Sequence, residues 1–319
     1  MRALVASALP RTVRSRQVDA MGNLLVQAGA GRGPKVLLLA HLDEVGLMVS
    51  GHTPEGHLRI RPWGGVPAVV VPGNPVLVGA DGVPGAIGWA PHHLTRGSAP
   101  RTPTYDELYV DIGAEDAAAA RRLAPVGEMV TFHTPYTVTP DGAMATGKAF
   151  DDRAGVYLAL ALLAEDWDFP LHVAFTVQEE VGLRGAQVAL RAVRPDLVLA
   201  LEATAAADTP ETPAGLSTRL GGGPALTTVD RATLADRGLR QALRRAGDDA
   251  GVPWQWRRGV GGGNEAGAAW HQGYRAAALS IPCRYLHAPV SRIHLGDLAA
   301  AEALLRSFLA HVQEVASDV

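Results

Sequence analysis

The sequence predicts an α/β fold, in which a mostly parallel sheet is flanked by helices and the chain is interrupted by a small all-β insert. Two observations carry the α/β part. Short apolar runs typical of fully buried strands recur at 35–40, 171–177, 196–201 and 276–281. Segments with helical patterns lie between or after them, at 152–166, 235–251 and 298–316. Strands that alternate with helices favour a layered domain with a mostly parallel sheet.

The third observation is a change of amino-acid composition along the chain. Residues from about 62 to 145 are dense in Gly, Pro and Val, as in "PWGGVPAVVVPGNPVLVGADGVPG". Short β-like runs separated by turn signals are typical of a small barrel or sandwich. We therefore divide the chain into an α/β domain, made of 1–62 and 146–319, and a β-rich insert at 63–145.

Composition limits the class of protein. The 319 residues are 47% hydrophobic and 19% charged, as in a folded protein with a large core, and the net charge is -3. Lys and Arg are scattered, so there is no basic stripe for nucleic acid. No apolar run approaches the roughly 20 residues that span a bilayer, and the N-terminus has no signal-peptide pattern. A single cysteine, Cys283, fits a reducing compartment. We expect a cytoplasmic globular protein with no nucleic-acid or membrane partner.

Histidines and acidic residues follow each of the apolar runs. His41 follows the first run, Glu179 and Glu180 the second, Glu202 the third and His287 the fourth. Ligands bind at the carboxyl ends of strands in open α/β sheets, so these side chains are expected at one edge. Asp151, in "GKAFDDRAG", lies where a loop enters a helix. Imidazoles and carboxylates together are typical ligands of a divalent metal.

The number of carboxylates favours two cations over one. Asp151, Glu180 and Glu202 as ligands, with Glu179 nearby, would put four negative charges in one pocket, which raises their pKa values unless cations neutralise them. Two divalent ions about 3.5–4 Å apart, sharing one carboxylate, would leave Glu179 free to act as general base on a bound water. Asp43 can accept the other ring N–H of His41 and fix its orientation.

Each of these residues also has a structural interpretation. A histidine after a strand is commonly solvated, and a pair of glutamates is commonly a charged loop. Asp152, before a helix, is expected as an N-cap. The metal hypothesis depends on all five sites falling at the same kind of position.

Three other features of the sequence do not indicate additional functional sites. "GVGGGNEAG", at 259–267, lacks the Gly-Lys-Ser/Thr of a P-loop and better suits close backbone approach. His92 and His93 lie in the insert and are expected to be structural or at an interface. Cys283, in "SIPCRY", is expected to be a small core residue.

Five ordered motifs resemble those of a known family: "AHLDEVGLMV", "GKAFDDRAG", "TVQEEVGLRGA", "LALEATAAADTP" and "SIPCRYLHAPV". They are similar to the TET-type dinuclear metallo-aminopeptidases, also called the glutamyl aminopeptidase or deblocking aminopeptidase family. The similarity runs from about residue 20 to the C-terminus and implies a zinc-peptidase-like catalytic domain with a PDZ-like or barrel insert.

The resemblance also implies roles for individual residues. His41, Asp151 and Glu202 would bind one metal and Asp151, Glu180 and His287 the other, with Asp151 as the bridge. Glu179 would be the general base and Asp43 would orient His41. The two ions per subunit would be zinc or cobalt, with manganese or magnesium possible. The substrates would be peptides with a free N-terminus, and the insert would form dimers that assemble into tetrahedral dodecamers.

The chain departs from the family pattern at three places. Glu202 stands where many relatives have Asp, and Asn264 and Glu265 stand in a "GGGNEAG" segment in place of Gly-Gly-Thr-Asp-Ala-Gly. The usual early Ser-Gly-x-Glu segment is not recognisable.

The sequence therefore predicts an aminopeptidase that acts through a two-metal-activated water, with a preference for neutral or hydrophobic N-terminal residues. One alternative is an amidase, deacylase or carboxypeptidase on the same scaffold. Another is a catalytically degenerate homologue that serves as a self-assembling shell or binding protein. A glycosidase is disfavoured, because adjacent glutamates do not flank a sugar bond from two sides.

Overall fold

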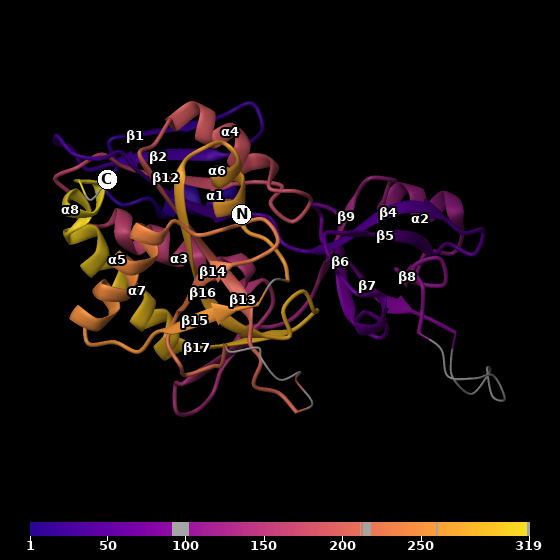
Figure 1. Ribbon diagram of the computed structural model, residues 1–319. Helices are drawn as coiled ribbons and strands as arrows, with labels where there is room; N and C mark the ends of the chain where they lie inside the picture. The colour runs from indigo at the N-terminus through magenta and orange to yellow at the C-terminus, as the bar shows by residue number, and fades with distance from the viewer. Residues whose placement is uncertain (91–101, 211, 213–217, 260, 318–319) are drawn as a thin grey trace.

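The computed structural model describes residues 1–90, 102–210, 212, 218–259 and 261–317. A large sheet flanked by helices forms one part, and a smaller closed barrel stands beside it (Figure 1). The predicted fold class is thereby confirmed. None of the helices in these ranges combines the length and the apolar character needed to cross a membrane.

Four central strands of the large sheet run parallel, and they correspond to the four apolar runs of the sequence. In sheet order they are β12 (Leu171–Thr176), β3 (Val36–His41), β13 (Leu197–Ala205) and β16 (Arg275–Arg284). The strands joined to them pair antiparallel, except that β15 runs parallel to β14. These outer strands are β1 (Ser15–Val18), β2 (Leu24–Ala28), β10 (Thr137–Val138), β11 (Met144–Gly147), β14 (Ala225–Val229), β15 (Gln255–Arg258) and β17 (Ser291–His294).

Helices cover both faces of this sheet, because its central strands are apolar on both sides. Leu38 of β3 faces one core and its neighbour Leu39 faces the other. The first core packs against α1 (Arg2–Ala8), α3 (Phe150–Leu163), α5 (Arg237–Asp249), α7 (Leu295–Ala310) and α8 (Val312–Ser317). The second packs against α4 (Arg184–Val193) and α6 (Glu265–His271). Cys283 lies fully buried in the first core, as predicted, and burial raises the pKa of its thiol to about 12.

The barrel has its own core, closed by six antiparallel strands. In barrel order they are β4 (Gly46–His52), β5 (Leu58–Trp63), β8 (Tyr109–Asp111), β7 (Val83–Gly88), β6 (Pro75–Val78) and β9 (Met129–Phe132). A 3₁₀ turn η1 (Ala68–Val70) and the short helix α2 (Ala117–Leu123) complete it. His92 and His93 lie outside the described residues.

The barrel begins and ends earlier than the 63–145 insert expected from the sequence. Its strands run from Gly46 to Phe132, whereas β10 and β11 join the large sheet through β17. The density of Gly and Pro marks turns and does not mark strand membership. In β5 the alternation of buried Leu58 and Ile60 with exposed Arg59 is the better signal.

Candidate metal centre and substrate pocket

The carboxyl ends of the four parallel strands bring the predicted side chains to one edge of the sheet. His41 is the last residue of β3 and is in register with Thr176, the last residue of β12. Glu179 and Glu180 follow β12, and Glu202 lies within β13. His287 follows β16 on a short turn.

Asp151, at the start of α3, lies between the two histidines. Its Oδ1 is 2.9 Å from Nε2 of His41, and its Oδ2 is 3.4 Å from Nε2 of His287. On the His287 side, Glu180 Oε2 is also 3.4 Å from that Nε2. On the His41 side, Glu202 Oε2 is 3.7 Å from the ring. One carboxylate therefore links two groups of potential ligands, each with one imidazole and one further carboxylate.

Asp43 supports this arrangement through different atoms from those expected. Its main-chain oxygen is 3.1 Å from Nδ1 of His41, whereas its Oδ1 is 3.7 Å away. The carboxylate instead accepts hydrogen bonds from the main-chain N–H groups of Glu179, at 3.1 Å, and Glu180, at 3.2 Å. The loop after β12 has N–H groups without strand partners, and the carboxylate satisfies them. When Nδ1 of His41 carries the ring proton and donates it to the main-chain oxygen of Asp43, the lone pair of Nε2 faces the carboxylates.

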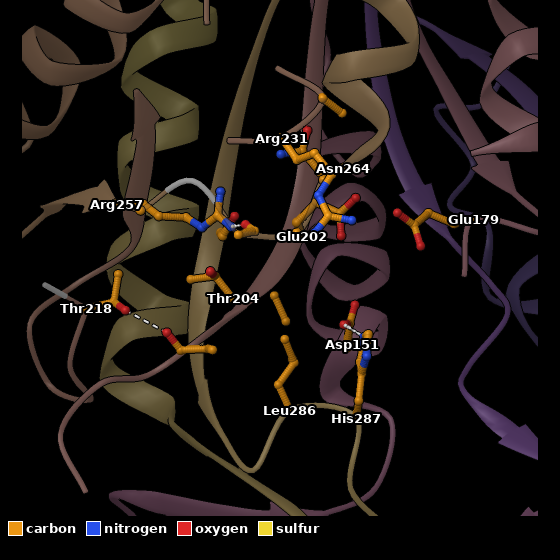
Figure 2. Close-up of a pocket in the computed structure, with 18 of the residues that line it drawn as sticks. Asp151, Glu179, Glu202, Thr204, Thr218, Arg231, Arg257, Asn264, Leu286 and His287 are labelled. Atoms are coloured by element: carbon orange, nitrogen blue, oxygen red, sulfur yellow. Dashed lines mark hydrogen bonds and ion pairs between the residues drawn. The ribbon is translucent and has the colours of Figure 1, made fainter. Parts of the chain in front are cut away.

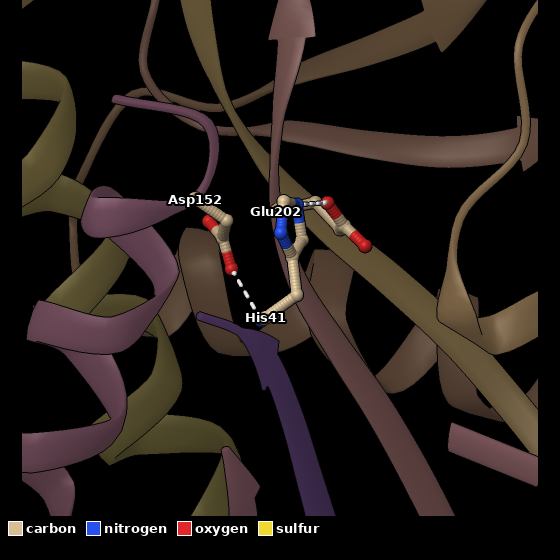
Figure 3. Close-up of side chains that lie close together, drawn as sticks. All are labelled: His41, Asp152 and Glu202. Atoms are coloured by element: carbon tan, nitrogen blue, oxygen red, sulfur yellow. Dashed lines mark hydrogen bonds and ion pairs between the residues drawn. The ribbon is translucent and has the colours of Figure 1, made fainter. Parts of the chain in front are cut away.

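Asp152 holds the first turn of α3 against the end of β3. Its carboxylate is buried and accepts a hydrogen bond from the main-chain N–H of Gly155, at 2.8 Å. It also accepts one from the main-chain N–H of His41, at 3.2 Å (Figure 3). The backbone of Asp151 and Asp152 is not helical, so the regular part of α3 starts after Asp152. The bond from Gly155 is therefore the N-cap interaction predicted for Asp152.

A pair of glycines brings the end of the barrel strand β5 against the cluster. Gly64 and Gly65 follow Trp63 directly. A Cβ atom at Gly65 would lie 3.0 Å from Nδ1 of His287, and one at Gly64 would lie 3.2 Å from Cβ of Glu180. Larger side chains would displace both of these residues, so the chain needs glycine there.

The cluster carries an excess of negative charge that a divalent cation would neutralise. Burial, together with neighbouring carboxylates, raises the pKa values of Glu179 and Glu180 to about 7. Burial lowers the pKa of His287, but the hydrogen bond to Asp151 and nearby negative charges outweigh this and raise it to about 9. Among the described residues, the buried Oε1 of Glu180 has no hydrogen-bond partner. Donor atoms of His41, Asp151 and Glu180 all lie within 4.8 Å of one another. These observations fit His and carboxylate ligation of a divalent metal.

A pocket of about 660 Å³ opens beside the cluster. The residues that line it include Asp151, Glu179, His287, Arg231 and Arg257. Figure 2 shows Arg257 on the opposite side of the pocket from Glu179. These arginines were missed from the sequence because none of the motifs contains them. The adjacent arginines in "WQWRRG", just before the glycine-rich segment, mark Arg257 in the sequence, and no comparable signal marks Arg231.

Glu265, the first residue of α6, is a second feature that the sequence left open. It is fully buried, and neither carboxyl oxygen has a hydrogen-bond partner among the described residues. Its main-chain N–H points to Oε1 of Glu202 at 3.5 Å. Burial raises the pKa of Glu265 to about 8.

We expect Glu265 to make the stability of the metal-free protein depend on pH. A raised carboxyl pKa means that the fold favours the protonated form. This contribution is complete below the ordinary value of 4.5 and is lost as the pH rises through about 8. Glu265→Gln should therefore match the parent protein near pH 5 and melt at least about 2 °C higher near pH 8.5.

Thermal melts of the chelator-treated protein across this pH range would measure the effect. Glu115→Gln, at an exposed position, is the matched control and should show no such divergence. If the difference in Tm between the parent protein and Glu265→Gln were the same at all pH values, titration of Glu265 would not be the source of the pH dependence.

A sheet edge of this kind, with imidazoles and carboxylates beside a pocket, is typical of hydrolases that work with divalent cations. The chain belongs to the M42 glutamyl aminopeptidase family, because the model of that family matches residues 22–304. The members of this family are metallopeptidases, and the chain is accordingly an aminopeptidase-family hydrolase that acts on peptides. The resemblance seen in the sequence is thereby confirmed.

Similar proteins include enzymes with different names. A glutamyl aminopeptidase of Lactococcus lactis is 31% identical over 92% of this chain and 85% of that protein. A lysyl aminopeptidase of Pyrococcus furiosus is 28% identical over 99% of this chain and 91% of that protein. A solved structure of the Pyrococcus horikoshii TET1 peptidase, described as able to assemble into a tetrahedron or a large octahedral shell, is 31% identical. It superposes with a TM-score of 0.87, covering 97% of this chain and 92% of that one.

Proposed function

We propose that this protein is a metal-dependent aminopeptidase that removes N-terminal residues from peptides. The position of Asp151 between His41 and His287 is the observation that carries the proposal. His41, Asp151 and Glu202 would hold one divalent cation, and Asp151, Glu180 and His287 would hold the other. Zinc or cobalt suits this mixture of nitrogen and oxygen ligands, and manganese or magnesium is the alternative.

The roles of the protein's own residues follow from their positions. Two bound cations would polarise the scissile carbonyl and lower the pKa of a water molecule. Glu179 would accept the proton of that water and deliver it to the leaving amine, and a pKa near 7 suits both tasks at neutral pH. Asp43 would keep Glu179 in place through its main-chain N–H.

Comparison of a free and an N-acetylated peptide tests the reaction class. After chelation and dialysis we expect no hydrolysis, and zinc or cobalt should restore release of the N-terminal residue from the free peptide alone. The free amine is needed because it would bind a metal or a nearby carboxylate. Cleavage of the acetylated peptide would favour an amidase or deacylase, and release from the other end a carboxypeptidase. If no metal binds and no peptide is cleaved, the protein is a shell or binding protein.

Self-association through the barrel is part of the proposal. The relative described as forming a tetrahedron supports dimers that build a dodecamer, which would have a mass of about 400 kDa. Native mass spectrometry would measure this mass directly. The buried and unpaired Cys283 supports the expected reducing, cytoplasmic setting.

The preference for neutral or hydrophobic N-terminal residues stays a prediction, since both arginines and apolar side chains line the pocket. No motif residue reports on this preference.

A further inference from the structure

Glu44 lies between two basic side chains that flank the segment carrying Asp151. It is part of the connection from β3 to β4. Its Oε2 is 2.5 Å from Nζ of Lys148, and its Oε1 is 3.2 Å from Nη2 of Arg153. No more than 28% of any of these three side chains is exposed, so salt in the solvent screens the two ion pairs only in part. One carboxylate therefore binds the chain on both sides of Asp151.

The segment that carries Asp151 does not fix this residue by secondary structure of its own. The strand before it, β11, ends at Gly147, and the backbone of Asp151 and Asp152 is not helical. Between them, Ala149 has a left-handed backbone conformation with a φ of 56°. Neither strand nor helix geometry therefore sets the direction of the Asp151 carboxylate, and contacts from outside the segment are needed to hold it.

Those contacts come from the loop that follows β3 and the candidate ligand His41. Nη1 of Arg153 donates a hydrogen bond of 3.0 Å to the carbonyl oxygen of Leu42, beside the bond of its Nη2 to Glu44. The loop is thus joined to the segment of Asp151 at Leu42 and at Glu44. These links accompany the direct approach of Asp151 Oδ1 to Nε2 of His41, at 2.9 Å.

We propose that Glu44 is a positioning residue, which acts through Lys148 and Arg153 to hold the Asp151 carboxylate between the two groups of metal ligands. The inference rests on the proposed metal-dependent function and adds a residue to it. Among the described residues, no hydrogen bond or ion pair joins the side chain of Glu44 to a candidate ligand, so its effect passes through the two basic side chains. Residues that hold a ligand in place commonly contribute about 10- to 100-fold to metal affinity.

Two substitutions of opposite charge separate positioning from simple electrostatics. Loss of the negative charge of Glu44 would weaken cation binding through charge alone, whereas loss of the positive charge of Lys148 would strengthen it. Positioning instead predicts that Glu44→Gln and Lys148→Gln both weaken zinc binding, by about 10- to 100-fold. Titration of the full-length, chelator-treated protein with zinc against a chromophoric chelator measures this. Lys148→Arg keeps a cation opposite Glu44 and should recover most of the parent affinity.

The cobalt-loaded protein gives a second readout, because its visible absorption bands depend on the geometry of the ligands. Glu44→Gln and Lys148→Gln should both shift these bands. Arg275→Gln is the matched control, since it breaks an ion pair of 3.3 Å with Asp236, whose partners are exposed to a similar extent. Arg275 is the first residue of β16 and so lies at the opposite edge of the sheet from the metal centre. This variant should keep the zinc affinity and the cobalt spectrum of the parent protein, whatever its effect on Tm.

The outcomes separate this inference from the proposed function. If the parent protein binds two zinc ions and Lys148→Gln binds them equally well or more tightly, the inference is overturned and the proposed function stands. Unchanged binding by Glu44→Gln would overturn it equally. Should Glu44→Gln fail to fold, the direction of the change in Lys148→Gln alone decides. If the parent protein binds no zinc, the proposed function fails and the inference fails with it.

Discussion

Replacement of Glu179 by glutamine is expected to lower kcat by roughly 10²- to 10⁴-fold without removing metal from the protein. Glutamine keeps the size of the side chain and loses its ability to take a proton. The carboxylate of Glu179 is 4.0 Å from Nε2 of His41, farther than those of Asp151, at 2.9 Å, and Glu202, at 3.7 Å. It is thus the carboxylate of this group that is least engaged with the imidazole, as a general base should be.

Glu180→Gln is the matched comparison, because the two glutamates are adjacent and both are held through Asp43. We expect this change to lower metal occupancy as well as kcat. Elemental analysis and steady-state kinetics on the same samples distinguish the two residues. Full kcat in Glu179→Gln would exclude its role as a base, and loss of metal would make it a ligand.

The second large effect is expected at Asp151, whose replacement by asparagine should lower the affinity for both cations at once. Its two oxygens face different histidines, at 2.9 and 3.4 Å, so no other described residue links both groups in this way. Loss of the metals removes several kcal/mol of transition-state stabilisation, which corresponds to about 10³-fold or more in rate. By contrast, Glu202→Gln and His287→Ala should each weaken one site and spare most binding at the other.

Titration with zinc against a chromophoric chelator would resolve two binding events and show which of them each variant loses. This readout does not depend on turnover. Asp166→Asn, at an exposed position near the end of α3, is the control and should bind like the parent protein. If Asp151→Asn retained two tight sites per chain, Asp151 would not be the shared ligand.

The positions of the candidate ligands could be predicted because parallel strands end at a common edge. His41, Glu202 and His287 follow or close apolar runs that are easy to recognise, and the periodicity fixes where those strands stop. The hydrogen-bonding atoms of Asp43 could not be predicted in this way. Spacing places Asp43 near both His41 and the loop after β12, and only the folded geometry decides that its carboxylate serves the loop.

The place of the pocket arginines in the fold could not be predicted, for a different reason. Arg257 lies on β15, which joins the sheet only through β14, and Arg231 lies on a turn after β14. Neither segment has the apolar periodicity that reveals a buried strand. Arg257 comes near Arg231 in the fold because its Nη1 lies 3.2 Å from Oδ2 of Asp230, the residue that precedes Arg231.

The connection between the barrel and the large sheet limits how the barrel can be exchanged for that of another protein. The chain enters the barrel at Gly46, five positions after His41, and Gly64 and Gly65 return from it to touch Glu180 and His287. A chimaera that replaced residues 46–132 with a foreign barrel would therefore also replace the two glycines that pack against these candidate ligands. Such an exchange would preserve the positions of Glu180 and His287 only if the new segment kept glycine at both places.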